Sequence, residues 1–167
     1  MKTIIDLNDL MIDQLNEMYN GNKLLLESIA RIKSNVSDLS LLNMVQDDIN
    51  SIEEQILHIK RAFDMVYMKQ HKKKAYVFVA LVERLNHLIK VSSDAEIKDA
   101  AIVIALQHIN HYKIASFGAI CTYAKMLDLY PIASLIHQSL EQEKMMDKRL
   151  AIRAEEVINR KAQIGDL

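Results

Sequence analysis

Two acidic side chains stand where an expected helix should be apolar. Glu143 and Asp147 are four residues apart, one helical turn, on a stripe that otherwise consists of Ile, Leu, Ala and Val. A carboxylate on such a face must be protonated, paired with a cation or bound to a metal ion. Bundles that hold two iron or manganese ions use carboxylates projecting inward from their helices. The spacing therefore indicates either the ligands of a metal site or a structural salt bridge.

Polar residues also interrupt the apolar stripes of the other long helices. They occur once in each helix, at Asn22, at Ser51 and Gln55, at Asn110 and Lys113, and at Glu143 and Asp147. A metal site shared by four helices would leave this distribution. Most of the members, however, are neutral amides or hydroxyls, which bind iron or manganese far more weakly than carboxylates do. The ammonium group of Lys113 repels a cation outright.

Histidines are the other candidate ligands. His108 and His111 are three residues apart, so one helix face could present both, and His58 and His137 lie on other expected helices. A histidine on a helix is more often a hydrogen-bonding residue than a metal ligand. We therefore expect no cofactor and no metal. If a metal does bind, iron or manganese is expected, with Glu143, Asp147 and His111 as the residual ligands.

Long helices must position these residues. The chain of 167 residues contains three Gly and one Pro, and such a scarcity of helix breakers favours long helices joined by short loops. Apolar residues at spacings of three and four predict helices over about 6–33, 39–68, 76–91 and 95–127, with a last one beginning near Pro131. The fold class is all-α: a single domain, 1–167, with four long helices and a short helix between the second and the third.

Composition argues against several functions. The formal net charge of −1 provides no field for nucleic acid or an anionic membrane, and no run of 18 apolar residues could span a membrane. A lone cysteine, Cys121, fits a reducing cytoplasm. Three separated glycines cannot form a phosphate-binding loop, and no arrangement of nucleophile and base stands out. An enzyme is therefore not the favoured interpretation.

Three segments resemble the YciE/YciF-like branch of the ferritin-like proteins, which is linked to bacterial stress responses. They are 97–102 (IKDAAI), 107–118 (QHINHYKIASFG) and 140–150 (LEQEKMMDKRL). Where the family has acids, this sequence has Asn110, Lys113, Gln142 and, in the first helix, Asn22. In the second helix the family's His-x-x-Glu-Thr-x-x-Gln-like stretch reads Asp48, Ser51, Ile52 and Gln55. The resemblance implies a ferritin-like bundle whose two-metal site has lost most of its ligands.

These replacements lead to a specific hypothesis for the core. Lys113 stands in for the metal, its charge is balanced by Glu143 or Asp147, and Asn22, Asn110 and Gln55 complete a hydrogen-bond network. The favoured function is a non-catalytic, stress-related bundle protein. Two alternatives stay open: a di-iron or di-manganese protein that handles oxygen with an atypical ligand set, and a bundle that binds a small molecule in its polar core.

The resemblance also implies a homodimer, while a further protein partner is unknown. Apolar residues near the end of the second helix and the start of the short helix are the expected contact surface, unless they pack within the chain. These residues are Met65, Val66, Tyr67, Met68, Tyr76 and Phe78.

Overall fold

The computed structural model describes residues 3–163, and every regular element among them is helical. The long helices are α1 (Leu7–Ile32), α2 (Leu39–Met65), α4 (Ala95–Met126) and α5 (Tyr130–Arg153). The short helix α3 (Tyr76–Val91) lies between α2 and α4 in the chain, which confirms the all-α class and the predicted order. Three brief elements complete the chain: the 3₁₀ turn η1 (Lys33–Asn35), the π-helix η2 (Ala154–Ile158) and α6 (Asn159–Gln163).

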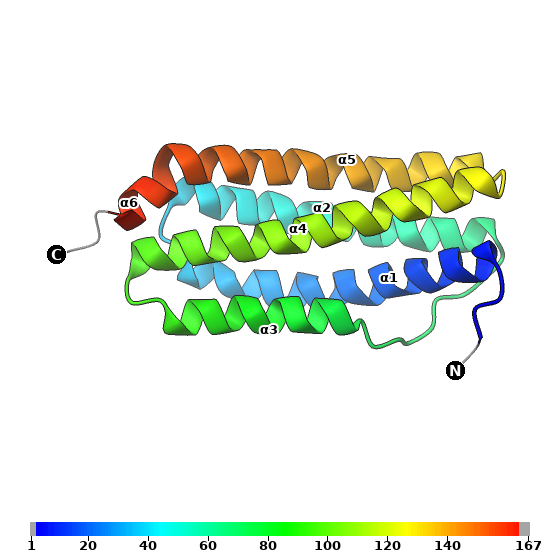
Figure 1. Ribbon diagram of the computed structural model, residues 1–167, viewed down its shortest axis with the longest axis horizontal. Helices are drawn as coiled ribbons and strands as arrows, with labels where there is room; N and C mark the ends of the chain where they lie inside the picture. Colours follow the sequence, from blue (N-terminus) through cyan, green and yellow to red (C-terminus); the bar gives the residue numbers. More distant parts are fainter. Residues whose placement is uncertain (1–2, 164–167) are drawn as a thin grey trace.

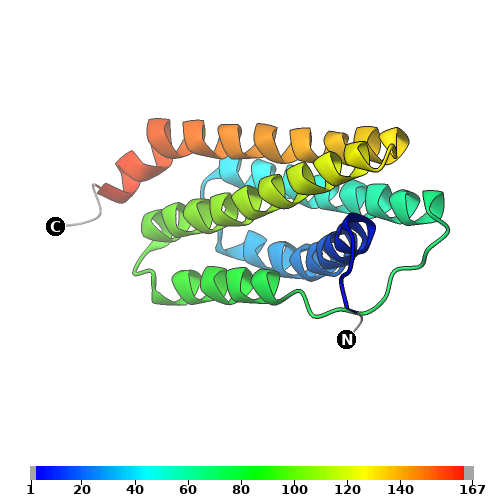
Figure 2. The same cartoon turned by 45° about the vertical axis from the view of Figure 1, so that its right-hand side comes forward.

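The four long helices pack as a closed ring. α1 contacts α2, α2 contacts α5, α5 contacts α4, and α4 returns to α1, so that one core runs along the axis (Figure 1). α3 lies outside this ring against α1 and α4, as Figure 2 also shows. No helix within residues 3–163 combines the length and the apolar character needed to cross a membrane.

Side-chain caps set where three of the long helices begin. Asp6, Asp38 and Asp94 each accept a hydrogen bond from the backbone N–H three residues further on, at the first turns of α1, α2 and α4. Such caps satisfy N–H groups that have no partner within the helix. α2 ends at Met65, three residues before the predicted end, because Tyr67 turns into the left-handed region with a φ of 54°.

Gly21 allows α3 to approach α1 closely. A Cβ atom at this position would overlap the ring of Phe78 on α3, whereas a Cβ at Gly118 would meet nothing within 4 Å. The Phe78 ring is fully buried and packs edge-to-face on Tyr112 of α4, with ring centroids 5.1 Å apart. Gly21 therefore has a packing role that outweighs the poor helix propensity of glycine.

Candidate functional site: a polar cluster in the bundle core

Six buried polar side chains from all four long helices face the core of the bundle. Asn22 comes from α1, Asp48 and Gln55 from α2, Asn110 and Lys113 from α4, and Glu143 from α5, and none exposes more than 3% of its surface. We call these six residues the core polar cluster. Helical periodicity explains their convergence, since each falls on the stripe that its helix turns toward the other three.

An ion pair lies at the centre of this cluster. Nζ of Lys113 is 2.6 Å from Oε1 of Glu143, and both side chains are 1% exposed. Nε2 of Gln55 donates a hydrogen bond of 2.7 Å to the same Glu143 oxygen. Oε1 of Glu143 on α5 is thus contacted by an ammonium group from α4 and an amide group from α2. These contacts join three helices at one atom.

Asp48 brings a second carboxyl group into the same region. Burial raises the pKa of Asp48, and the neighbouring carboxylate of Glu143 raises it further, while Lys113 opposes both effects; the result is a pKa of about 7. Asp48 was missed as a member of the site. The signal was available, because Asp48 is seven residues from Gln55 and so lies on the same face two turns away.

The cluster contains many polar atoms that lack partners. Within residues 3–163, every buried side-chain nitrogen or oxygen without a hydrogen bond belongs to these six residues. Apart from Nζ of Lys113, they are both amide atoms of Asn22, both of Asn110, Oδ1 of Asp48, Oε1 of Gln55 and Oε2 of Glu143. Each such atom costs about 1–3 kcal/mol. The expected hydrogen-bond network is confirmed for Gln55, while Asn22 and Asn110 have no partner among the protein atoms.

A hydrogen-bonded strip between α2 and α5 leads from this cluster to the surface. Nε2 of Gln55 lies 3.3 Å from Oε1 of Gln142, which is half-buried. Nε2 of Gln142 in turn donates a 2.5 Å hydrogen bond to Oε2 of Glu54, an exposed side chain. We call Glu54 and Gln142 the α2–α5 strip.

Three residues of the sequence-based site lie outside the cluster. Ser51 is half-buried on α2. Asp147 lies at the rim, where its carboxylate is 3.2 Å from Nε2 of His111 and accepts a hydrogen bond of 3.4 Å from Gln107. The His111 side chain is 67% exposed. Of the two acids proposed to balance Lys113, the structure pairs it with Glu143.

The residues of the cluster do not fit a two-metal centre. No group of three or more His, Cys, Asp or Glu side chains in the described chain is close enough to share a metal ion. The ammonium of Lys113 stands against the carboxylate best placed to be a ligand, and three of the other members are neutral amides. Divalent iron or manganese prefers anionic oxygen ligands, so this set opposes such an ion.

The buried histidine His58, beside the α2–α5 strip, is a hydrogen-bonding residue, as expected for a histidine on a helix. Nδ1 of His58 is 2.9 Å from Oγ of Ser139, and Nε2 of His58 is 3.8 Å from Oε1 of Glu54. The order acid, histidine, serine resembles that of a nucleophilic triad. The Ser139 side chain is completely buried, however, so its hydroxyl cannot meet a substrate. Burial lowers the pKa of His58, which favours the neutral ring in this structural hydrogen bond.

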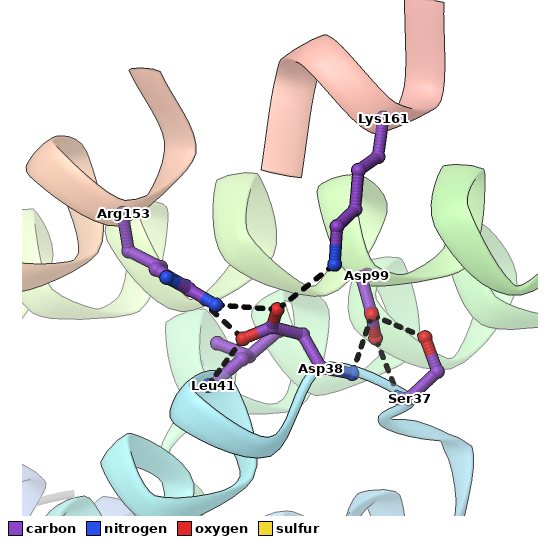
Figure 3. A network of polar contacts seen from close by, with 6 residues as sticks. All are labelled: Ser37, Asp38, Leu41, Asp99, Arg153 and Lys161. Atoms are coloured by element: carbon purple, nitrogen blue, oxygen red, sulfur yellow. Dashed lines mark hydrogen bonds and ion pairs between the residues drawn. The ribbon is translucent and has the colours of Figure 1, made fainter. Parts of the chain in front are cut away.

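A second polar cluster closes one end of the bundle (Figure 3). Asp99 of α4 accepts hydrogen bonds from the backbone N–H and hydroxyl of Ser37 and from the N–H of Asp38. Asp38 in turn accepts two hydrogen bonds from Arg153, at 2.6 and 3.1 Å, and one from Lys161 at 3.4 Å. Burial raises the pKa of Asp38, but these donors outweigh it and lower the pKa to about 2. Every oxygen here has a partner, so this cluster is a structural clamp.

The fold and the core together define a four-helix bundle with buried polar residues in an apolar core and a fifth helix on its outer side. The chain belongs to the family described as a domain of unknown function (DUF892), whose profile matches residues 6–163. Protein YciF of Escherichia coli strain K12 is 30% identical over 164 residues, which are 98% of this chain and 97% of that protein. The expected family is therefore confirmed.

Solved structures show the same fold. The crystal structure of the E. coli stress protein YciF matches with a TM-score of 0.88 at 29% identity, covering 95% of this chain and 99% of that one. YcfI from Rhodopseudomonas palustris matches with a TM-score of 0.87 at 20% identity, covering 90% of this chain and 96% of that one. The core polar cluster thus lies in a bundle whose helices are arranged as in these two structures.

Proposed function

We propose that this chain is a non-catalytic bundle protein in which the Lys113–Glu143 ion pair has replaced a two-metal site. The observation that carries the proposal is the 2.6 Å contact between these two buried groups. A lysine ammonium placed among inward-facing side chains supplies the positive charge that bound metal would otherwise supply. Asn22, Asn110 and Gln55 are the neutral remainder of the site.

A role in stress tolerance is the biological part of this proposal. It is supported by the description of the E. coli relative as a stress protein. Without a reactive centre, such a protein would act through its surface, as a homodimer or with another protein partner, in the cytoplasm. Four of the six residues expected at a contact surface support this view, since Met65, Tyr67, Met68 and Tyr76 are exposed. Phe78 is buried within the chain instead.

Metal content tests the chemical part of the proposal. The protein is purified without chelators, bound metals are measured by mass spectrometry, and Fe(II) is added anaerobically before oxygen is admitted. We expect metal near zero and no iron oxidation above that of buffer. About two metal ions per chain, with oxidation above background, would instead favour the oxygen-handling alternative.

A further inference from the structure

Seven side-chain atoms of the core polar cluster have no hydrogen-bond partner in the protein and need one from a bound molecule. We propose that this cluster binds a small group of internal water molecules between the four helices. The inference rests on the proposed function, because it concerns what occupies the site once Lys113 has displaced metal. A buried water makes about three hydrogen bonds, so a small number of molecules can partner the seven atoms that have none.

Outside the core polar cluster, the buried side-chain nitrogen and oxygen atoms of residues 3–163 have hydrogen-bond partners. Asn16 on α1 is as completely buried as Asn22, yet its amide donates to the carbonyl of Ile12 at 3.0 Å and accepts from the N–H of His71 at 3.0 Å. Buried Ser139 is likewise partnered, by His58. Since this fold satisfies buried amides and hydroxyls elsewhere, the missing partners of Asn22 and Asn110 point to a bound molecule.

The chemistry of the free atoms selects water over a metal cation. They include both acceptors and donors, because each of the two asparagines presents an oxygen and a nitrogen. Water can donate to the first and accept from the second, whereas a cation can satisfy only the oxygens. The ammonium of Lys113 also repels a cation. A neutral molecule that both donates and accepts is the matching ligand.

The α2–α5 strip gives these waters a path to solvent. The hydrogen-bonded side chains pass from buried Gln55 through half-buried Gln142 to exposed Glu54. These side chains offer polar partners to a water molecule at each step between the cluster and solvent, unlike an apolar contact between helices. The core waters are thus expected to exchange with solvent between α2 and α5.

A high-resolution crystal structure is the first test. We expect ordered water within hydrogen-bonding distance of Asn22 and Asn110, with no anomalous signal at the iron and manganese absorption edges. A dry cluster whose asparagines pair directly with each other would overturn the inference and leave the proposed function standing. Anomalous peaks beside Glu143 would overturn both. A cation coordinated only by oxygens, traced by soaking crystals in rubidium, would overturn the water assignment alone.

Nuclear magnetic resonance tests the same inference in solution on the wild-type chain. The side-chain amide protons of Asn22 and Asn110 are expected to show cross-peaks to long-lived water. The amide of Asn16 is the internal control, since it is equally buried and is partnered by protein atoms, and no such cross-peak is expected there. Absence of the cross-peaks at both Asn22 and Asn110 would overturn the proposal.

Discussion

Nζ of Lys113 and Oε1 of Glu143 lie 2.6 Å apart in the middle of a helical bundle, and each side chain is almost fully screened from solvent. Charges in such surroundings are tolerated only when they are paired, because each has lost its hydration. Each of these two buried charges is therefore tolerated only while the opposite charge of its partner is present.

Replacing Lys113 with Met is expected to destabilise the fold by about 3–5 kcal/mol, because Glu143 is left as an unpaired buried charge. Urea denaturation followed by circular dichroism measures the loss. The double variant Lys113→Met, Glu143→Met should recover most of it, since both charges are then gone. Lys144→Met, which breaks a contact between exposed side chains of Lys144 and Glu141, is the matched control and should cost less than about 1 kcal/mol. If Lys113→Met and Lys144→Met destabilised the fold equally, the buried pairing of Lys113 with Glu143 would be contradicted.

Restoring the acids should restore metal binding. The triple variant Asn22→Glu, Asn110→Glu, Lys113→Glu places carboxylates where the resemblance implies them, and about two Mn(II) or Fe(II) ions per chain are expected. Mass spectrometry of the purified variant measures the metal, and the melting temperature should rise when Mn(II) is added.

The control for this experiment carries the same change of charge on the surface. Asn43, Asn50 and Lys60 are exposed on α2, and changing all three to Glu should leave metal content near zero. If the core variant also retained no metal and gained no stability from Mn(II), the core would not be a former metal site.

Stability should fall as the pH rises from about 4 to about 7. The pKa of Asp48 is raised from an ordinary 3.8 to about 7 in the folded chain, so the folded state holds a proton that the unfolded state releases. The stabilising contribution is complete below pH 3.8 and is lost as the pH passes through about 7. Asp48→Asn should remove this fall in a series of urea denaturations between these values. An unchanged slope in that variant would assign the pH dependence to another group.

Asp38 has the opposite dependence. Its pKa of about 2 is below the ordinary 3.8, so its contribution is present above pH 3.8 and is lost as the pH falls through about 2. Arg153→Met removes two of the hydrogen bonds to Asp38, so in the same series of urea denaturations it should reduce the loss of stability below about pH 4. The fall between about pH 4 and pH 7 should be unchanged in this variant.

The two helical glycines should respond oppositely to alanine. Gly21→Ala is expected to cost about 1–3 kcal/mol, because the new methyl group displaces the ring of Phe78. Gly118→Ala meets open space and should stabilise the chain by up to about 1 kcal/mol through helix propensity. Thermal denaturation compares both variants with the wild type. If both variants shifted the melting temperature by a similar amount in the same direction, the contact with Phe78 would not determine the effect of Gly21→Ala.

Patterns that repeat along one helix could be predicted from the sequence. The apolar stripes of α1, α2 and α4 are local signals, and they predicted the helix order and the inward direction of Asn110 and Lys113. The choice of Glu143 over Asp147 as partner was not predictable, because the two acids are one turn apart and only the angle between α4 and α5 separates them.

Features that depend on a distant partner were missed for the same reason. The close packing of Phe78 against Gly21 could not be predicted from α1 alone, because Phe78 lies far along the chain. Asp48 is a different case, because its spacing of seven residues from Gln55 already placed it on the same face of α2. Nothing in the amino-acid composition of residues 154–158 indicated the π-helix η2.

The π-helix at Ala154–Ile158 also bears on how related sequences should be aligned. Arg153 and Lys161 are eight residues apart, which in a regular α-helix would separate them by about 80° around the axis, yet both reach Asp38 (Figure 3). A π turn accommodates one additional residue, so the effective separation is close to seven residues, or nearly two full turns. The wide turn is what the insertion of one residue into a regular α-helix would produce. A relative that is one residue shorter in this stretch should have an unbroken α-helix and the same two contacts.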